Sequence, residues 1–81
     1  MNATLPERVN HLVRLKMAPR VGMLPSEWLQ VRDDIEMSEL DVKAVLTFVN
    51  QKILLGIPIP NTPVTVQELI KYILASADTL N

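Results

Sequence analysis

The chain has 81 residues, 48% hydrophobic but only 4% aromatic, so we expect one domain over residues 1–81 with a modest aliphatic core. The 8 basic and 9 acidic residues give a net charge of −1 with no segment rich in Lys and Arg, which argues against a nucleic-acid partner. The sequence has no cysteine, which excludes disulfides, thiolate nucleophiles and zinc–thiolate sites.

The N-terminal region predicts a helix and no export signal. The first ten residues lack the apolar stretch of a signal peptide, so we expect a cytoplasmic protein without a membrane span. Thr4 is followed three positions later by Glu7, with Pro6 between them, which is typical of a helix start. Apolar residues then recur at helical spacing until Pro19, where we expect the helix to end.

The next segment is predicted to be mostly irregular. Residues 18–25 contain proline at both ends and should form a loop that turns three apolar side chains inward: Val21, Met23 and Leu24. Ser26 is a candidate cap for a short helical turn that continues to Val31 and carries Trp28, which we expect to be a partly buried anchor.

The central helix has the clearest pattern. Ser38 with Asp41 three positions later forms a near capping box. Apolar residues follow at helical spacing and predict one buried face: Val42, Val45, Leu46, Val49 and Ile53. Gly56 suits the C-terminal stop of this helix.

The segment after the central helix leaves two interpretations open. It combines four large apolar residues, Leu54, Leu55, Ile57 and Ile59, with prolines that prevent regular structure up to Pro63. We expect these side chains either to fold over the core or to form a hydrophobic contact site for a partner.

A last helix completes the predicted fold. Thr65 and Glu68 repeat the helix-start pattern, and an apolar stripe follows, consisting of Val66, Leu69, Ile70, Ile73 and Leu74. The elements together predict an all-α protein, a small bundle of three to four helices.

The side chains offer little for catalysis. His11 is the single histidine, lies on the predicted polar side of its helix, and has no second histidine with which to bind a metal. Asp33, Asp34 and Glu36 match no calcium-loop spacing and predict a solvated acidic turn. We therefore name no catalytic and no metal-binding residue, and an autonomous enzyme is the least favoured class.

The order of elements and several short motifs resemble the acyl carrier proteins. The likeness covers nearly the whole chain and rests on five stretches: Glu7-Arg8-Val9, the run from Asp34 to Asp41, Ile57-Pro58, Thr65-Val66 and Tyr72-Ile73. The resemblance implies a helical bundle of that type, in which a serine in an Asp-Ser-Leu triplet carries 4'-phosphopantetheine and an acyl thioester.

The attachment motif departs from the family pattern. An ungapped alignment places Ser38 on the family's aspartate and Glu39 on its serine, and a shift by one residue would turn Lys52 inward, where an unpaired ammonium is costly. Ser38 is then either a plain helix cap, with no cofactor on the protein, or an unusual site for 4'-phosphopantetheine.

The favoured function is docking to protein partners. The central helix shows Lys43 and Lys52 where carriers of this kind usually present carboxylates, so we expect partners other than their usual basic enzymes. The expected contact residues are Leu40, Lys43, Leu54, Leu55, Ile57 and Ile59, and the expected partners are enzymes of a specialised acyl, fatty-acid or polyketide pathway. An active carrier modified on Ser38 and an unrelated helical interaction module are the alternatives.

Overall fold

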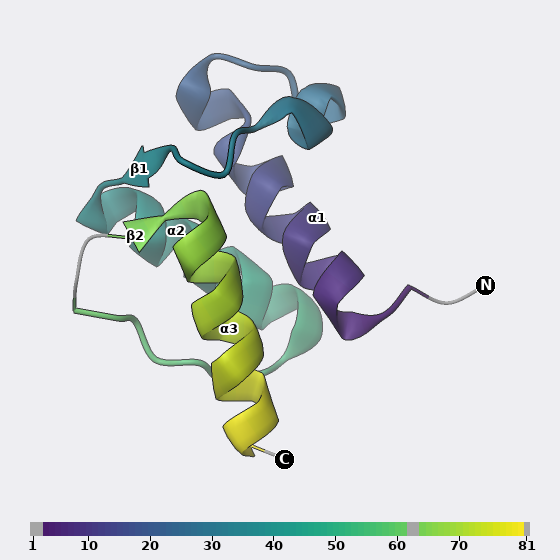
Figure 1. Ribbon diagram of the computed structural model, residues 1–81, viewed down its shortest axis with the longest axis vertical. Coiled ribbons are helices and arrows are strands. Elements are labelled where there is room, and N and C mark those ends of the chain that lie inside the picture. The colour runs from purple at the N-terminus through teal and green to yellow at the C-terminus, as the bar shows by residue number, and fades with distance from the viewer. Residues whose placement is uncertain (1–2, 62–63, 81) are drawn as a thin grey trace.

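Three α-helices surround one aliphatic core in the computed structural model, which describes residues 3–61 and 64–80 (Figure 1). In chain order the elements are α1 (Leu5–Met17), the 3₁₀ helices η1 (Pro19–Val21) and η2 (Pro25–Gln30), strand β1 (Glu36–Met37), α2 (Glu39–Ile53), strand β2 (Val64–Thr65) and α3 (Val66–Leu80). The predicted small helical bundle is confirmed. No helix in the described ranges is both long and apolar enough to traverse a bilayer.

All three α-helices begin where the sequence predicts. Thr4 Oγ1 accepts a hydrogen bond from the Glu7 backbone N–H at 3.3 Å, and the Glu7 carboxylate accepts one from the Thr4 N–H. The same reciprocal pair starts α2, where Ser38 Oγ accepts from the Asp41 N–H at 3.1 Å, and α3, where Thr65 is paired with a glutamate. These boxes satisfy backbone donors that the first helical turn leaves without a partner.

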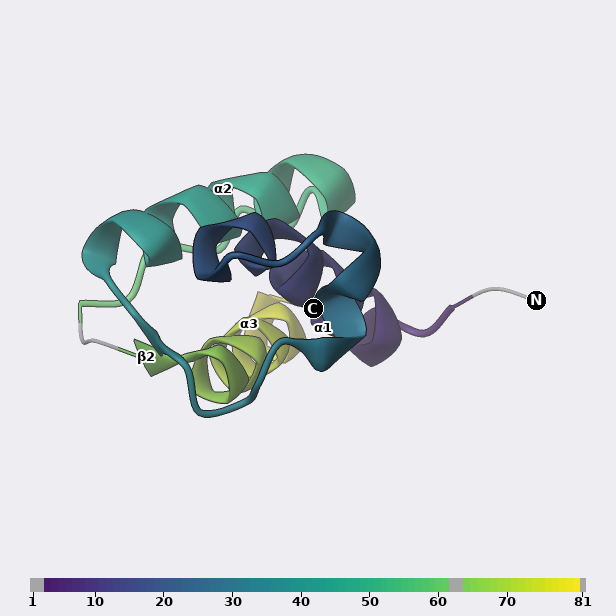
Figure 2. The same ribbon diagram turned by 90° about the horizontal axis from the view of Figure 1, so that it is seen from above.

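The core lies where the inner faces of the three helices meet. Helix α1 contributes Val9, Val13 and Met17; α2 contributes Val42, Val45, Leu46 and Val49; and α3 contributes Val66, Leu69, Ile70, Ile73 and Ala77. Each set follows the 3.6-residue period of a helix, so each helix buries one stripe and exposes its opposite side. Figure 2 shows α2 lying across the other two helices, with its far side directed away from them.

A short antiparallel strand pair corrects the prediction of a purely helical protein. Glu36 pairs with Thr65 and Met37 with Val64. Two further backbone bonds extend the contact, from the Val66 N–H to the Ile35 oxygen and from the Gln67 N–H to the Asp33 oxygen. This pairing holds the start of α2 beside the start of α3.

The connection between α1 and α2 is more helical than predicted. Gly22, at φ 79°, ends η1, and Val21 and Met23 pack against the core as expected. Leu24 is 65% exposed, so the prediction that it points inward is wrong. Ser26 lies within η2, which is capped instead by the Glu27 carboxylate, the acceptor for the Leu24 N–H at 2.9 Å.

Leu54 ends α2, two residues before the glycine expected to do so. It adopts a left-handed conformation with φ 53°, and its N–H donates to the Asn50 oxygen. Gly56 also has a positive φ, of 64°. The following segment folds back along the bundle, where Tyr72 Oη donates to the Pro58 oxygen at 2.6 Å. Pro63, part of the predicted irregular stretch, lies outside the described residues.

Candidate functional site: a groove along α2

The outer side of α2 borders a shallow, open groove of about 440 Å³. Residues of α2 form most of it, and Lys16 of α1 and Arg20 of η1 form the opposite wall. The lining consists of Lys16, Arg20, Leu40, Lys43, Ala44, Thr47, Phe48 and Gln51. Three of these side chains are basic and none is acidic. We call this surface the α2 groove.

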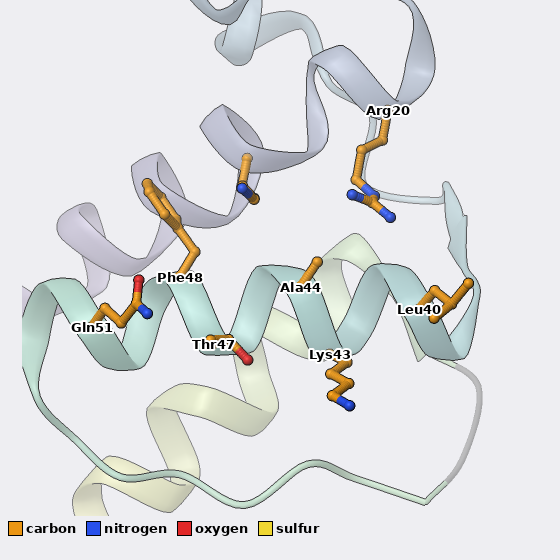
Figure 3. A pocket seen from close by; sticks show the side chains of 8 residues that line it. Arg20, Leu40, Lys43, Ala44, Thr47, Phe48 and Gln51 are labelled. Atoms are coloured by element: carbon orange, nitrogen blue, oxygen red, sulfur yellow. The ribbon is translucent and has the colours of Figure 1, made fainter.

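The floor of the α2 groove is an apolar stripe. Leu40, Ala44 and Phe48 follow one another at intervals of four residues, which places them on one side of the helix (Figure 3). Leu40 is 74% exposed, although it is a large aliphatic side chain. Helix α2 therefore has two apolar stripes, and the one that faces the groove is only partly covered, since Ala44 and Phe48 are half-buried and Leu40 is exposed.

Cations flank the aromatic end of the floor. The Phe48 ring has Lys16 Nζ at 5.3 Å from its centroid and Lys52 Nζ at 5.6 Å. Ammonium groups at such distances are attracted to the negative face of an aromatic ring. The two lysines thus stay near the floor and carry their charge to the edge of the groove.

At the Leu40 end of the groove, Arg20 bonds to Asp41, the carboxylate of the capping box that starts α2. Its Nε donates to Asp41 Oδ1 at 2.5 Å, and Figure 3 shows the side chain reaching down toward α2. Burial by itself would raise the pKa of the Asp41 carboxyl, but the Arg20 guanidinium and the hydrogen bonds with Ser38 outweigh it and hold that pKa below its usual value. Asp41 is therefore ionised across the neutral range.

The two residues that the resemblance places at the attachment motif, Ser38 and Glu39, lie at the start of α2. Ser38 is the N-cap and is exposed, and Glu39 is exposed in the first turn. The serine hydroxyl accepts a hydrogen bond from the Asp41 N–H, so it is already engaged in capping the helix. Both residues border the Leu40 end of the groove in sequence, but neither lines it.

The sequence-predicted contact residues do not come together as one surface. Leu40 and Lys43 line the α2 groove, whereas Leu54 and Ile59 are exposed, at 85% and 48%, in the segment beyond the other end of the helix. Leu55 is half-buried against the core. Ile57 is only 3% exposed, so its expected place on a contact surface is wrong, because its side chain fills the core.

The other candidate side chains form structural contacts. His11 is exposed as predicted and its ring lies 4.6 Å from that of Trp28, which is partly buried. Asp33 accepts from Arg14, and Asp34 pairs with Arg32 at 2.7 Å. Within residues 3–61 and 64–80, no group of three or more histidines, cysteines or carboxylates is placed to hold a metal ion.

Sequence reasoning missed most of the groove. Lys16 and Arg20 are distant in sequence from α2, and only the fold brings them to it. The stripe of Leu40, Ala44 and Phe48 carried a readable signal, since apolar residues at i, i+4 and i+8 form a second helical face. The longer stripe on the core side of α2 led to the prediction of a single apolar face, so the second face was missed.

Comparisons of this chain with protein-family models, with curated proteins and with solved structures found no match.

Proposed function

We propose that this protein is a non-catalytic docking protein of acyl-carrier type that binds pathway enzymes through the outer side of α2. The α2 groove is the observation that supports this proposal. It combines a partly exposed apolar stripe with a basic rim, the composition expected of a protein-binding surface. The expected partners are enzymes of a specialised acyl, fatty-acid or polyketide pathway, as the resemblance implies.

The role of Ser38 in this proposal is that of a helix cap. Its hydroxyl and backbone N–H both take part in the capping box with Asp41, and this structural task accounts for a serine at the position. Glu39 stands where the family carries its modified serine and has no hydroxyl to modify. Docking then proceeds without a tethered acyl chain.

A photo-crosslinking amino acid in place of Leu40 tests the docking proposal. Leu29 provides a matched control position, since it is 73% exposed and lies on η2, outside the groove lining. We expect enzymes of acyl transfer or condensation to be captured from the native host at position 40 and not at position 29. Equal capture at both positions, or none at position 40, would overturn the proposal.

The second candidate is an active carrier, which the exposure of Ser38 at the start of the central helix favours. A phosphopantetheine arm on this exposed residue would supply a thiol for acyl transfer. Coexpression with a broad-specificity phosphopantetheinyl transferase, followed by intact-mass measurement, separates the two candidates. An added phosphopantetheine that is lost in Ser38→Ala establishes the carrier; an unchanged mass favours docking alone.

Replacing Glu39 tests the alignment itself. If residue 39 is the family's attachment position, Glu39→Ser should gain the modification under the same coexpression. If the parent protein is modified and Ser38 is the site, the ungapped register is wrong.

A further inference from the structure

We infer that the occupant of the α2 groove is an acidic amphipathic helix of a partner protein. The inference rests on the proposed docking function and specifies the chemistry of the partner. It is drawn from the charge and shape of the groove, which differ from those of the chain as a whole.

The charge of the groove is opposite in sign to that of the protein. The chain carries −1 overall, yet every ionisable residue that lines the groove is basic: Lys16, Arg20 and Lys43. Since Arg20 is paired with Asp41, the excess positive charge of the lining comes from the two lysines. Lys52 adds a fourth cation at the Phe48 end. Complementary charge at the rim of an interface guides a partner and excludes partners of like charge, so carboxylates belong opposite these side chains.

Two of the same basic side chains also border a second hollow. An adjoining hollow of about 350 Å³ shares Lys16, Arg20 and Phe48 with the α2 groove. Its other lining residues are Leu15, Pro19 and Pro25, so it too is apolar with basic edges. The two hollows thus adjoin each other at Lys16, Arg20 and Phe48.

The shape of the floor suits a helix. Leu40, Ala44 and Phe48 form one row of side chains along α2, with the small Ala44 side chain between two large ones. Rows of this kind pack into the grooves between the side-chain rows of a second helix. A partner helix with apolar residues every three or four positions would cover Leu40, while its carboxylates would meet the lysines.

A protein segment fits these features better than a polyanion does. The net charge of −1 gives no long-range attraction toward a nucleic acid, and Glu39 stands exposed beside the Leu40 end of the floor. Attraction is confined to the groove, which matches a short segment with a few carboxylates.

The test uses a synthetic helical peptide of about 15 residues, about four turns, with leucines on one side and glutamates on the other. A matched peptide carries lysines in place of the glutamates. Binding to the full chain is measured by fluorescence anisotropy, and the contact surface is mapped by amide chemical-shift changes. We expect the acidic peptide alone to bind and to shift the amides of α2, with weaker binding when the salt concentration rises from about 50 to about 300 mM.

Two pairs of variants locate the contact. Lys43→Glu should weaken binding about fivefold, since it replaces an attraction by a repulsion, whereas Lys71→Glu, an exposed reversal on α3, should leave it unchanged. Leu40→Ala should also weaken binding about fivefold, and Leu29→Ala should not. All four positions are exposed, and circular dichroism verifies that each variant is folded.

Several outcomes would overturn the inference. These are equal binding of both peptides, equal effects of the two charge reversals, and binding to phosphatidylserine-containing vesicles that depends on Lys43 while the acidic peptide fails to bind. If crosslinking at position 40 succeeds but the acidic peptide fails, docking stands and only the chemistry assigned to the partner is wrong. If crosslinking fails and the peptide binds, the docking proposal is overturned, and the peptide shows only that the groove attracts acidic apolar helices.

Discussion

The Asn50 side-chain amide pairs with both backbone polar groups of Ile57. Nδ2 donates to the Ile57 oxygen at 3.0 Å, and the Ile57 N–H donates to Oδ1 at 3.0 Å. The Asn50 backbone oxygen also accepts the N–H of Leu54, which ends α2. Asn50 thus accepts the capping bond of the central helix and holds the following segment, whose Ile57 side chain enters the core.

Asn50→Ala should lower the free energy of unfolding by about 1–2 kcal/mol. The loss of two hydrogen bonds leaves the Ile57 backbone groups without partners, and the better helix propensity of alanine offsets only part of that cost. Urea denaturation followed by circular dichroism measures the change. Gln51→Ala, at an exposed position of the same helix, is the control and should stay within about 0.5 kcal/mol of the parent. An equal effect of both substitutions would contradict the assigned role of Asn50.

Ser38→Ala should destabilise the protein by about 1 kcal/mol, because it removes the side-chain acceptor for the Asp41 N–H at the start of α2. Ser38→Asp retains an acceptor and should leave the stability close to that of the parent. Thermal unfolding of the three proteins at one pH makes the comparison. A cap function would be refuted if alanine and aspartate behaved alike.

Leu54→Gly should raise the free energy of unfolding by about 0.5–1 kcal/mol. Leu54 holds a left-handed backbone conformation that glycine adopts without the steric cost of a Cβ atom, and its side chain is 85% exposed, so little packing is lost. Leu54→Ala is the control, because it shortens the side chain but keeps the Cβ atom, and it should stay near the parent value. A decrease in stability for Leu54→Gly, measured in urea, would show that the leucine side chain is needed there.

Stability should fall in acid partly through Asp41. Its pKa is below the ordinary value of 3.8 in the folded protein, so the unfolded chain binds a proton more readily. The resulting stabilisation is present above that ordinary value and is lost as the pH falls through the folded pKa. Asp41→Asn should therefore show a weaker loss of stability between about pH 5 and pH 2 than the parent protein.

Arg20→Gln tests whether Arg20 lowers the pKa of Asp41. It removes the guanidinium that helps to lower the pKa of Asp41, so that pKa should move up toward its ordinary value. Titration of the carboxyl carbon signal by NMR measures the shift. A pKa of Asp41 unchanged by Arg20→Gln would assign the lowering to the hydrogen bonds with Ser38 alone.

The sequence by itself determined the three α-helices. Each starts at a hydroxyl residue followed by a carboxylate three positions later, and this signal is local, because the two side chains bond only within the first turn. The buried face of α2 was equally readable, since Val42, Val45 and Val49 follow the helical period. Helical starts and stripes depend on neighbours in sequence, and these are visible before folding.

Only the tertiary structure decided the strand pair and the α2 groove. The pairing of Met37 with Val64, the bond from Arg20 to Asp41 and the seating of Ile57 in the core all join residues whose approach depends on how the helices pack. No local propensity encodes such contacts. The sequence pattern therefore predicted which residues could be buried or exposed on each helix, whereas the packing of the three helices determined which exposed residues share a surface.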